Sequence, residues 1–168
     1  VVRYLAEVAR VDTQRASNDG WAPICVASLN GQHEIVRYLA EVAGVDARQS
    51  DNVTTGATAL LAAAQGGHLE VVRYLSEVAQ VDTRRADKDG FTPFYVAAQE
   101  GHLEVVRYLA EVALVDTQRA TNKGFAPFYV ASMRVHLEVV RYLAEVARVD
   151  TQRAANNGST PFYVAAQE

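Results

Sequence analysis

Hydrophobic and polar residues alternate with a helical period over the segment from His102 to Ala113. The apolar residues fall three and four positions apart, a spacing that predicts an amphipathic helix with one buried face. The opposite face carries Glu104, Arg107 and Glu111, which form only weak pairs in solvent at this spacing. The expected buried face consists of Leu103, Val106, Leu109, Ala110 and Ala113, broadened by Val105 and Val112.

A shorter helix is predicted just before this one, from Pro93 to about Gln99. Thr92 is suited to cap its first turn, and a proline at the first helical position gives up no hydrogen bond. Gly90 supplies the positive φ of the preceding turn, and Gly101 is expected to end the helix in the left-handed region. The segment therefore consists of a turn, a short helix, a tight reversal, a longer helix and a loop.

This arrangement recurs along the chain. The tripeptide Arg-Tyr-Leu starts at residues 3, 37, 73, 107 and 141, so the period is 34 residues with one longer interval. One helix pair of this length cannot bury both of its apolar faces. Stacked copies complete one another's core, and the repetition therefore predicts a repeat architecture.

The repeated sequence motifs resemble those of a known family. Gly-Phe-Thr-Pro-Phe-Tyr-Val-Ala-Ala from residue 90, with Gly-His-Leu-Glu-Val-Val from residue 101, resembles the ankyrin repeat pattern G-x-T-P-L-H-x-A-A…G-H. The resemblance covers essentially the whole chain. It implies an all-α ankyrin-repeat solenoid of stacked helix-turn-helix units with finger loops or short β-hairpins. The expected single array over residues 1–168 has partial repeats at 1–16 and 155–168 and full repeats at 17–52, 53–86, 87–120 and 121–154.

Several positions depart from the family pattern and predict local weakness. Ala22 and Ala126 replace the capping threonine, a change that costs about 0.5–2 kcal/mol. Val135 replaces the glycine of the reversal, which should strain the backbone by roughly 1–3 kcal/mol unless the chain follows another path. The histidine that follows Thr-Pro-Leu in the family is replaced by Cys25, Leu61, Tyr95, Tyr129 and Tyr163.

The ends and one finger are also expected to differ. Neither end carries the polar capping repeat that solenoids need, so apolar side chains there should be partly exposed. The finger from Asp46 to Gly56 is two residues longer than the others and is expected to protrude or bulge. The finger arginines suggest a solvated row balanced by aspartates, or a site for an acidic partner. The expected exposed residues are Leu5, Val8, Phe162 and Val164, and the finger arginines are Arg15, Arg48, Arg85, Arg119 and Arg153.

The composition of the chain limits the kinds of ligand and activity that can be expected. The 168 residues carry a net charge of −4, which disfavours general nucleic-acid binding, and no apolar run is long enough for membrane insertion. The single cysteine, Cys25, cannot form an internal disulfide and fits an intracellular, cytoplasmic location. Equivalent histidines of stacked repeats lie too far apart to share a metal ion, and we expect them to satisfy backbone groups at helix starts. No catalytic set or cofactor motif is present, so no enzyme activity and no cofactor are predicted.

Comparison of the copies points to one variable surface. Residues 101–134 and 135–168 are identical at 25 of 34 positions, and most differences fall in the turn and at the ends of the first helix. In a solenoid of this family the turns and first helices line the concave face, where aromatic residues, Met and Arg favour recognition. Alternatively, the aromatic residues pack against neighbouring turns, or the copies have drifted neutrally. The candidate partner-binding residues are Trp21, Leu29, Asn30, Lys88, Phe91, Gln99, Glu100, Lys123, Phe125, Met133 and Arg134.

The resemblance and this surface together predict a non-catalytic scaffold for protein–protein interaction. The partner is an unidentified protein, and the chain is expected to be monomeric, with self-association possible through its uncapped ends. Two alternatives stay open at this point. The chain could be a structural spacer or elastic segment of a longer array, or a targeting module for a catalytic domain elsewhere in its parent chain.

Overall fold

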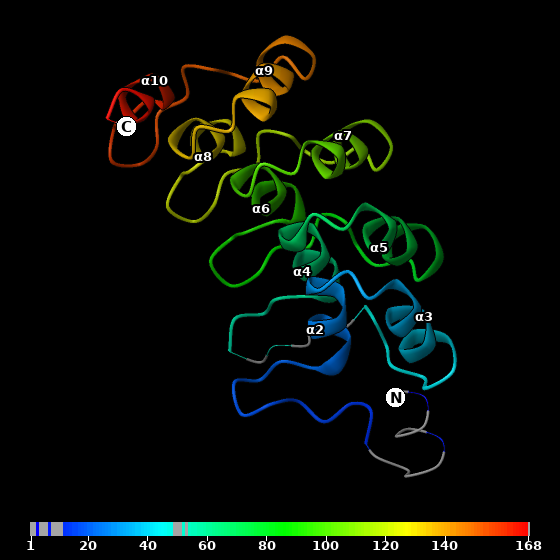
Figure 1. The fold of residues 1–168 in the computed structure, drawn as a ribbon. Coiled ribbons are helices and arrows are strands. Elements are labelled where there is room, and N and C mark those ends of the chain that lie inside the picture. Colours follow the sequence, from blue (N-terminus) through cyan, green and yellow to red (C-terminus); the bar gives the residue numbers. More distant parts are fainter. Residues whose placement is uncertain (1–2, 4–6, 8–11, 49–51, 53, 168) are drawn as a thin grey trace. The chain divides into compact units, whose positions relative to one another are not determined.

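The computed structural model describes residues 3, 7, 12–48, 52 and 54–167 (Figure 1). The chain divides into two compact units, Val1–Asp82 and Thr83–Glu168. All regular structure in the described residues is helical, and the fingers there are loops without strands. The all-α prediction is therefore confirmed, and of the two finger types expected the loop is the one observed.

The described residues of the first unit form two helix pairs. In each pair a short first helix packs against a second helix, and the first helices α2 and α4 lie side by side (Figure 1). The second helix of the latter pair continues as a π-helical turn, η1, so that its last turn is wider than that of the other repeats. The elements are α2 Pro23–Leu29, α3 His33–Glu41, α4 Ala59–Gly66, α5 Leu69–Arg73 and η1 Tyr74–Val78.

The second unit repeats this arrangement. Its first helices α6, α8 and α10 pack in series, and α7 and α9 form a second row beside them. Each predicted full repeat contains one helix pair, and the last predicted segment contains α10 alone. The elements are α6 Pro93–Gln99, α7 Leu103–Glu111, α8 Pro127–Met133, α9 Leu137–Glu145 and α10 Pro161–Ala165.

The first helices begin where the capping residues predict. The Thr92 hydroxyl accepts a hydrogen bond from the Tyr95 N–H at 3.1 Å, and Thr58 and Thr160 cap α4 and α10 in the same way. Ala126 has the same extended backbone but offers no side-chain acceptor to α8. One N–H in the first turn of α8 therefore lacks the side-chain partner that it has in α6.

We expect Ala126→Thr to raise the free energy of unfolding by about 1 kcal/mol, because the new hydroxyl caps α8. The measurement is the urea unfolding midpoint of the variant against the unchanged protein. Thr92→Ala is the matched control and should lower stability by a similar amount at the equivalent position of α6. Equal midpoints for Ala126→Thr and the unchanged protein would contradict the cap.

The reversal between the two helices is left-handed in every described repeat. Gly101 has φ of +79°, as predicted, and Val135 has φ of +59° at the same place in the next repeat. The His136 N–H still donates to the Ala131 carbonyl at 2.9 Å, matching the bond from His102 to Ala97. The chain therefore does not avoid the strain at Val135 by taking another path.

The buried face of the second helix is narrower than predicted. Val105, Val106 and Leu109 are fully buried, but Val112 is 59% exposed, so its inclusion was wrong. The helix ends at Glu111, so Val112 lies beyond its last residue, and Leu114 then takes a left-handed φ of +50°. Leu103, Ala110 and Ala113 are half-buried, and the missed core residue is Tyr108.

The expectation for the chain ends is confirmed in part. Phe162 is 81% exposed, as predicted, but Val164 is buried because it packs with Ala155 and with Tyr129 of the adjoining repeat. Leu5 and Val8 lie outside the described residues. The longer finger lies partly outside them as well. Of its described residues Ala47 and Asn52 are buried, whereas Asp46, Arg48, Thr54 and Thr55 are exposed.

Tyrosines of the Arg-Tyr-Leu motif link neighbouring second helices. The Tyr74 hydroxyl donates to Glu41 Oε1 at 3.1 Å, and the Tyr142 hydroxyl donates to Glu111 Oε1 at 2.9 Å. Burial, together with the bond to the carboxylate, raises the pKa of each tyrosine to about 12. The motif that marks the repeat in the sequence thus also joins successive repeats.

Because the pKa values of Tyr74 and Tyr142 are raised, we expect the protein to lose stability in alkali. A folded pKa above the ordinary value of about 10 means that the stabilisation is complete below pH 10 and is lost as the pH rises towards 12. The double variant Tyr74→Phe/Tyr142→Phe should show a shallower fall of unfolding free energy across this range. Parallel curves for the two proteins in urea titrations from pH 9 to pH 12, roughly the window set by these values, would contradict the assignment.

Candidate functional site

Two aromatic pairs form the centre of the candidate site in the second unit. The rings of Phe91 and Tyr95 stack with centroids 5.2 Å apart, and those of Phe125 and Tyr129 lie 5.1 Å apart. Each tyrosine is buried and each phenylalanine is partly exposed. The tyrosine that replaces the family histidine therefore supports the aromatic residue four positions before it, a pairing that the spacing itself could have indicated.

Phe125 and Met133 also pack against a buried cluster that joins their repeat to the next one. Both are half-buried and pack against the cluster formed by Tyr129, Ala155 and Val164. The alternative in which the aromatic residues pack against neighbouring structure thus applies to part of the Phe125 side chain. The exposed part of Phe125 and Met133 is still available to a partner.

The ends of the first helices carry the polar members of the site. Gln99 Nε2 donates to Glu100 Oε1 at 2.9 Å, while His136 Nε2 lies 2.8 Å from the Gln99 carbonyl. The Gln99 backbone is thereby held by the following repeat, and its side chain stays near the surface beside Glu100. Arg134 is exposed. Burial raises the pKa of Tyr95 to about 12, and the positive charge of Arg134 offsets part of this rise.

The finger tips are joined by asparagine side chains. Asn122 Nδ2 donates to the Lys88 carbonyl at 2.9 Å, and Asn156 Nδ2 reaches the Asn122 carbonyl at 3.4 Å. The side chains of Lys88 and Lys123 are exposed at these tips. The tips are therefore held in register from repeat to repeat while their lysines face solvent.

The finger arginines form neither a uniform row balanced by aspartates nor a uniform site for an acidic partner. Arg119 Nη1 donates to the Arg84 carbonyl and Arg153 Nη1 to the Gln118 carbonyl, both at 2.8 Å. These two therefore tie one finger to the preceding one, which the sequence analysis missed. Arg48 pairs with Asp46 of its own finger at 3.3 Å, as a balanced row would require.

The first unit holds the remaining predicted residues. Trp21 is half-buried and Leu29 is exposed, while Asn30 Nδ2 donates to the Val26 carbonyl at 2.8 Å and closes α2. Trp21 and Asn30 line a cavity of about 770 Å³ together with Val26, other residues of α2 and α3, and the first finger. The eleven predicted residues thus fall into one group in each unit.

Histidines join the first helices within each unit. His68 Nε2 lies 3.0 Å from the Leu29 carbonyl, and His136 makes the equivalent contact with Gln99. The prediction that histidines satisfy backbone groups is confirmed for these two, and the carbonyl belongs to the preceding repeat. Among the described residues no group of three His, Cys, Asp or Glu side chains could hold a metal ion.

Comparison with known families decides the identity of this architecture. Residues 42–119 match the family model of ankyrin repeats, in three copies. This part of the chain is made of ankyrin repeats. No curated protein matches the sequence. Ankyrin repeats are generally protein–protein interaction modules and are typically non-catalytic, and their all-α stacking is the packing described above.

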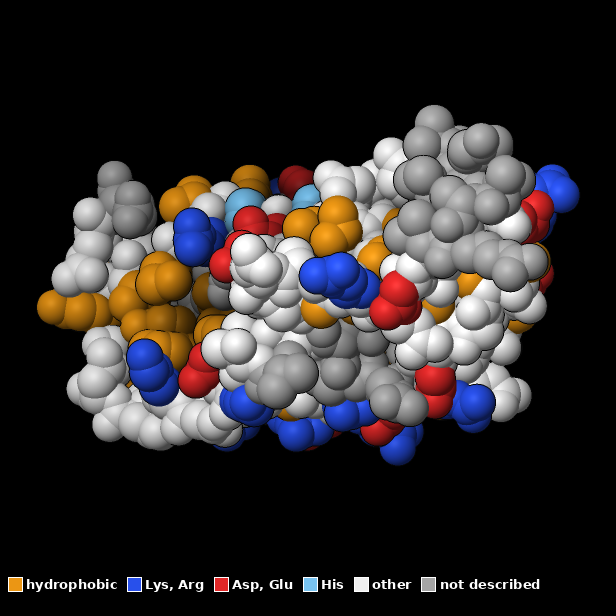
Figure 2. Space-filling model, turned by 90° about the horizontal axis from the view of Figure 1, so that it is seen from below, with side chains coloured by type: hydrophobic (Ala, Val, Ile, Leu, Met, Phe, Trp, Pro, Cys, Tyr) orange, Lys and Arg blue, Asp and Glu red, His pale blue; other side chains and the backbone are white. Residues whose placement is uncertain are grey.

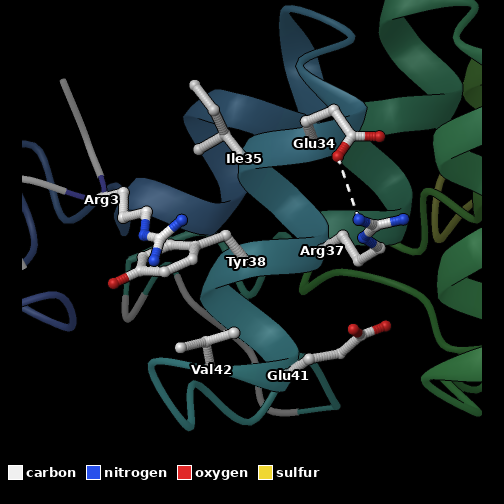
Figure 3. A pocket seen from close by; sticks show the side chains of 7 residues that line it. All are labelled: Arg3, Glu34, Ile35, Arg37, Tyr38, Glu41 and Val42. Atoms are coloured by element: carbon white, nitrogen blue, oxygen red, sulfur yellow. Dashed lines mark ion pairs between the residues drawn. The ribbon is translucent and has the colours of Figure 1, made fainter.

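The first unit also carries a cavity that the sequence did not predict. It measures about 450 Å³ and lies on the outer face of α3, where Arg37 pairs with Glu34 at 3.3 Å (Figure 3). The Arg3 guanidinium lies beside the ring of Tyr38, and Glu41 stands at the other end of the helix (Figure 3). Arginines and carboxylates occur here together, so the lining does not favour an anionic ligand.

The surface of the chain mixes both signs of charge. Figure 2 shows Lys and Arg side chains lying next to Asp and Glu side chains over the face that it presents. This distribution agrees with a sequence that contains 16 basic and 20 acidic residues. In the described part of the chain, no helix combines the length and the apolar character that crossing a bilayer requires.

Proposed function

We propose that this chain is a non-catalytic scaffold that binds a partner protein through its turn tips and first helices. We call the residues Lys88, Phe91, Gln99, Glu100, Lys123, Phe125, Met133 and Arg134 of the second unit the binding strip. Trp21, Leu29 and Asn30 form a separate candidate group in the first unit. The observation that supports this function best is the pair of partly exposed phenylalanines, each stacked on a buried tyrosine.

The stacked pairs suit recognition for a physical reason. Rings that are already held in one orientation lose little conformational freedom when a partner covers them, so more of the contact energy appears as affinity. Aromatic residues, Met and Arg contribute most where interfaces are tight. The binding strip places Phe91, Phe125, Met133 and Arg134 on a scaffold whose buried valines and leucines are the same in successive copies.

The changes between successive copies support the same conclusion. The Phe125 position is occupied by Ser159 in the next repeat, and Met133 by Gln167. The second-helix core residues, such as Val105 and Leu109, recur unchanged at 139 and 143 and are buried in both places. A surface that varies over a constant core is what recognition of a particular protein requires.

The test compares proteins captured by the unchanged chain and by the variant Phe91→Ala/Arg134→Ala from an extract of the cells that produce it. We expect binding of specific proteins to fall at least tenfold in the variant, roughly the effect of losing 1.4 kcal/mol. Val112→Ala is the control, because Val112 is an exposed apolar residue outside the binding strip. Urea unfolding of all three proteins shows whether the fold is kept.

Two outcomes would count against this function. Equal capture by the unchanged chain and the variant would show that the binding strip does not recognise the captured proteins. Lost stability with unchanged binding would show that Phe91 serves packing alone. Either result would favour the spacer alternative, for which near-identical copies are sufficient.

A further inference from the structure

The two repeats that carry the binding strip have opposite charges at equivalent positions. Asp89 precedes the turn glycine in one repeat, and Lys123 takes that place in the next. Glu100 follows α6 with φ of −93° and ψ of 0°, and Arg134 follows α8 with φ of −91° and ψ of 2°. All four side chains are exposed, and no ion pair joins the two members of either pair in the described structure. The charge is therefore reversed between repeats, while the backbone at the helix ends is the same.

The fold of the turn does not require this reversal. Asp87 Oδ1 accepts a hydrogen bond from the Phe91 N–H at 2.8 Å. One repeat later, Thr121 Oγ1 accepts the equivalent bond from the Phe125 N–H at 3.2 Å. A neutral hydroxyl replaces the carboxylate at this position, so the turn forms with or without a negative charge.

The net charge around the two phenylalanines therefore differs in sign. The turn and helix end beside Phe91, residues 87–91 and 99–100, contain three carboxylates and one lysine, a net charge of −2. The equivalent residues beside Phe125, 121–125 and 133–134, contain two cations and no carboxylate, a net charge of +2. Each partly exposed ring thus lies in a region of one dominant sign.

The two charged regions lie side by side within the second unit. The helices α6 and α8 pack against each other (Figure 1), and Asn122 Nδ2 joins the finger tips by donating to the Lys88 carbonyl at 2.9 Å. Further described helices precede and follow this pair of repeats in the chain. Packed helices lie about 8–10 Å apart, a distance that an extended segment covers in about three residues and a helix in about six.

We infer that the partner of the binding strip contributes a segment with a basic side chain at one end, an acidic side chain at the other and apolar residues between them. The inference rests on the proposed function, in which the strip binds a partner protein. The basic group faces the repeat of Phe91, the acidic group faces the repeat of Phe125, and the apolar residues cover the two rings. A segment bound in the opposite direction would set like charges against each other, so the strip accepts one direction only.

The experiment selects binding peptides from a random library displayed on phage, with the unchanged chain and with the variant Lys123→Asp/Arg134→Glu. This variant gives the repeat of Phe125 the two residues that the repeat of Phe91 has at these positions, so the fold should be kept. We expect the unchanged chain to select peptides in which a basic and an acidic residue flank apolar residues in a constant order. These peptides should bind the variant about tenfold more weakly, because two attractions become repulsions.

The double variant Arg141→Glu/Arg148→Glu is the matched control. It makes the same change in net charge at two exposed arginines outside the binding strip, and it should bind the selected peptides like the unchanged chain. Urea unfolding of both variants shows whether the fold is kept. Raising the salt concentration tests the same contacts without any substitution, and it should weaken binding to the unchanged chain because exposed charges are screened.

The outcomes separate this inference from the proposed function. Peptides whose binding is lost in Phe91→Ala, but which carry no ordered charges, would overturn the inference and leave the proposed function standing. Peptides that bind Phe91→Ala as well as the unchanged chain, or a library without any enriched peptide, would count against both. Self-association of the unchanged chain that disappears in Lys123→Asp/Arg134→Glu would identify a second copy as the occupant and overturn the inference as well.

Discussion

Gly101→Val should lower the free energy of unfolding by roughly 3 kcal/mol. Gly101 has φ of +79°, a conformation that a β-branched residue adopts only under strain of about 1–3 kcal/mol. A Cβ at this position would also lie 2.6 Å from His136 Nδ1. The imidazole would have to move away from the Gln99 carbonyl, which costs a further hydrogen bond of about 1 kcal/mol.

The two causes can be separated with a double-mutant cycle. In a His136→Ala background the steric part of the penalty disappears, and Gly101→Val should then cost only the backbone strain. Urea unfolding of the four proteins gives the coupling energy, which we expect to be about 1 kcal/mol. A coupling of zero would mean that the histidine ring adjusts without losing its bond. No loss of stability in Gly101→Val would contradict the strain as well.

Val135→Gly should have the opposite effect and raise the free energy of unfolding by roughly 1–2 kcal/mol. Val135 occupies the place of Gly101 one repeat later and keeps the left-handed conformation, with φ of +59°. Its side chain is 64% exposed, so its removal sacrifices little packing. The relief of strain exceeds the greater chain entropy that glycine gives the unfolded state, which is about 0.4–1 kcal/mol.

The measurement is again urea unfolding, with Val135→Ala as the intermediate case. Alanine removes the β-branch but keeps Cβ, so its stability should lie between those of valine and glycine. Amide exchange adds a local readout, because the strained reversal and the chain ends are expected to exchange fastest in the unchanged protein. Exchange that is slowest around Val135, or a glycine variant less stable than the parent, would contradict this interpretation.

Features controlled by adjacent residues were predicted from the sequence. The bounds Pro93–Gln99 and the cap at Thr92 follow from a threonine, a proline and a glycine within ten residues. The left-handed Gly101 and the strained Val135 follow equally from the spacing of the repeat. The left-handed Leu114 was missed, although the repeat register places it at the position of Gly44, which has φ of +70°.

The sequence by itself determined the repeating unit, its helix starts and turns and the family to which residues 42–119 belong. Those properties depend on residues a few positions apart, within one unit. Only the tertiary structure decided which residues join successive repeats. Tyr142 bonds to Glu111, His136 to Gln99 and Arg153 to Gln118, across separations of more than 30 residues. Stacking brings these partners together, and no local pattern specifies them.

The candidate site shows the same division. The sequence marked Phe91 and Phe125 as candidates, because aromatic residues are enriched in interfaces and the position varies between copies. The structure showed that buried tyrosines pack against both rings and that Phe125 and Met133 also pack against a cluster joining two repeats. Exposure is set by everything that packs around a side chain. For that reason identical residues are buried in α8 and exposed in α10.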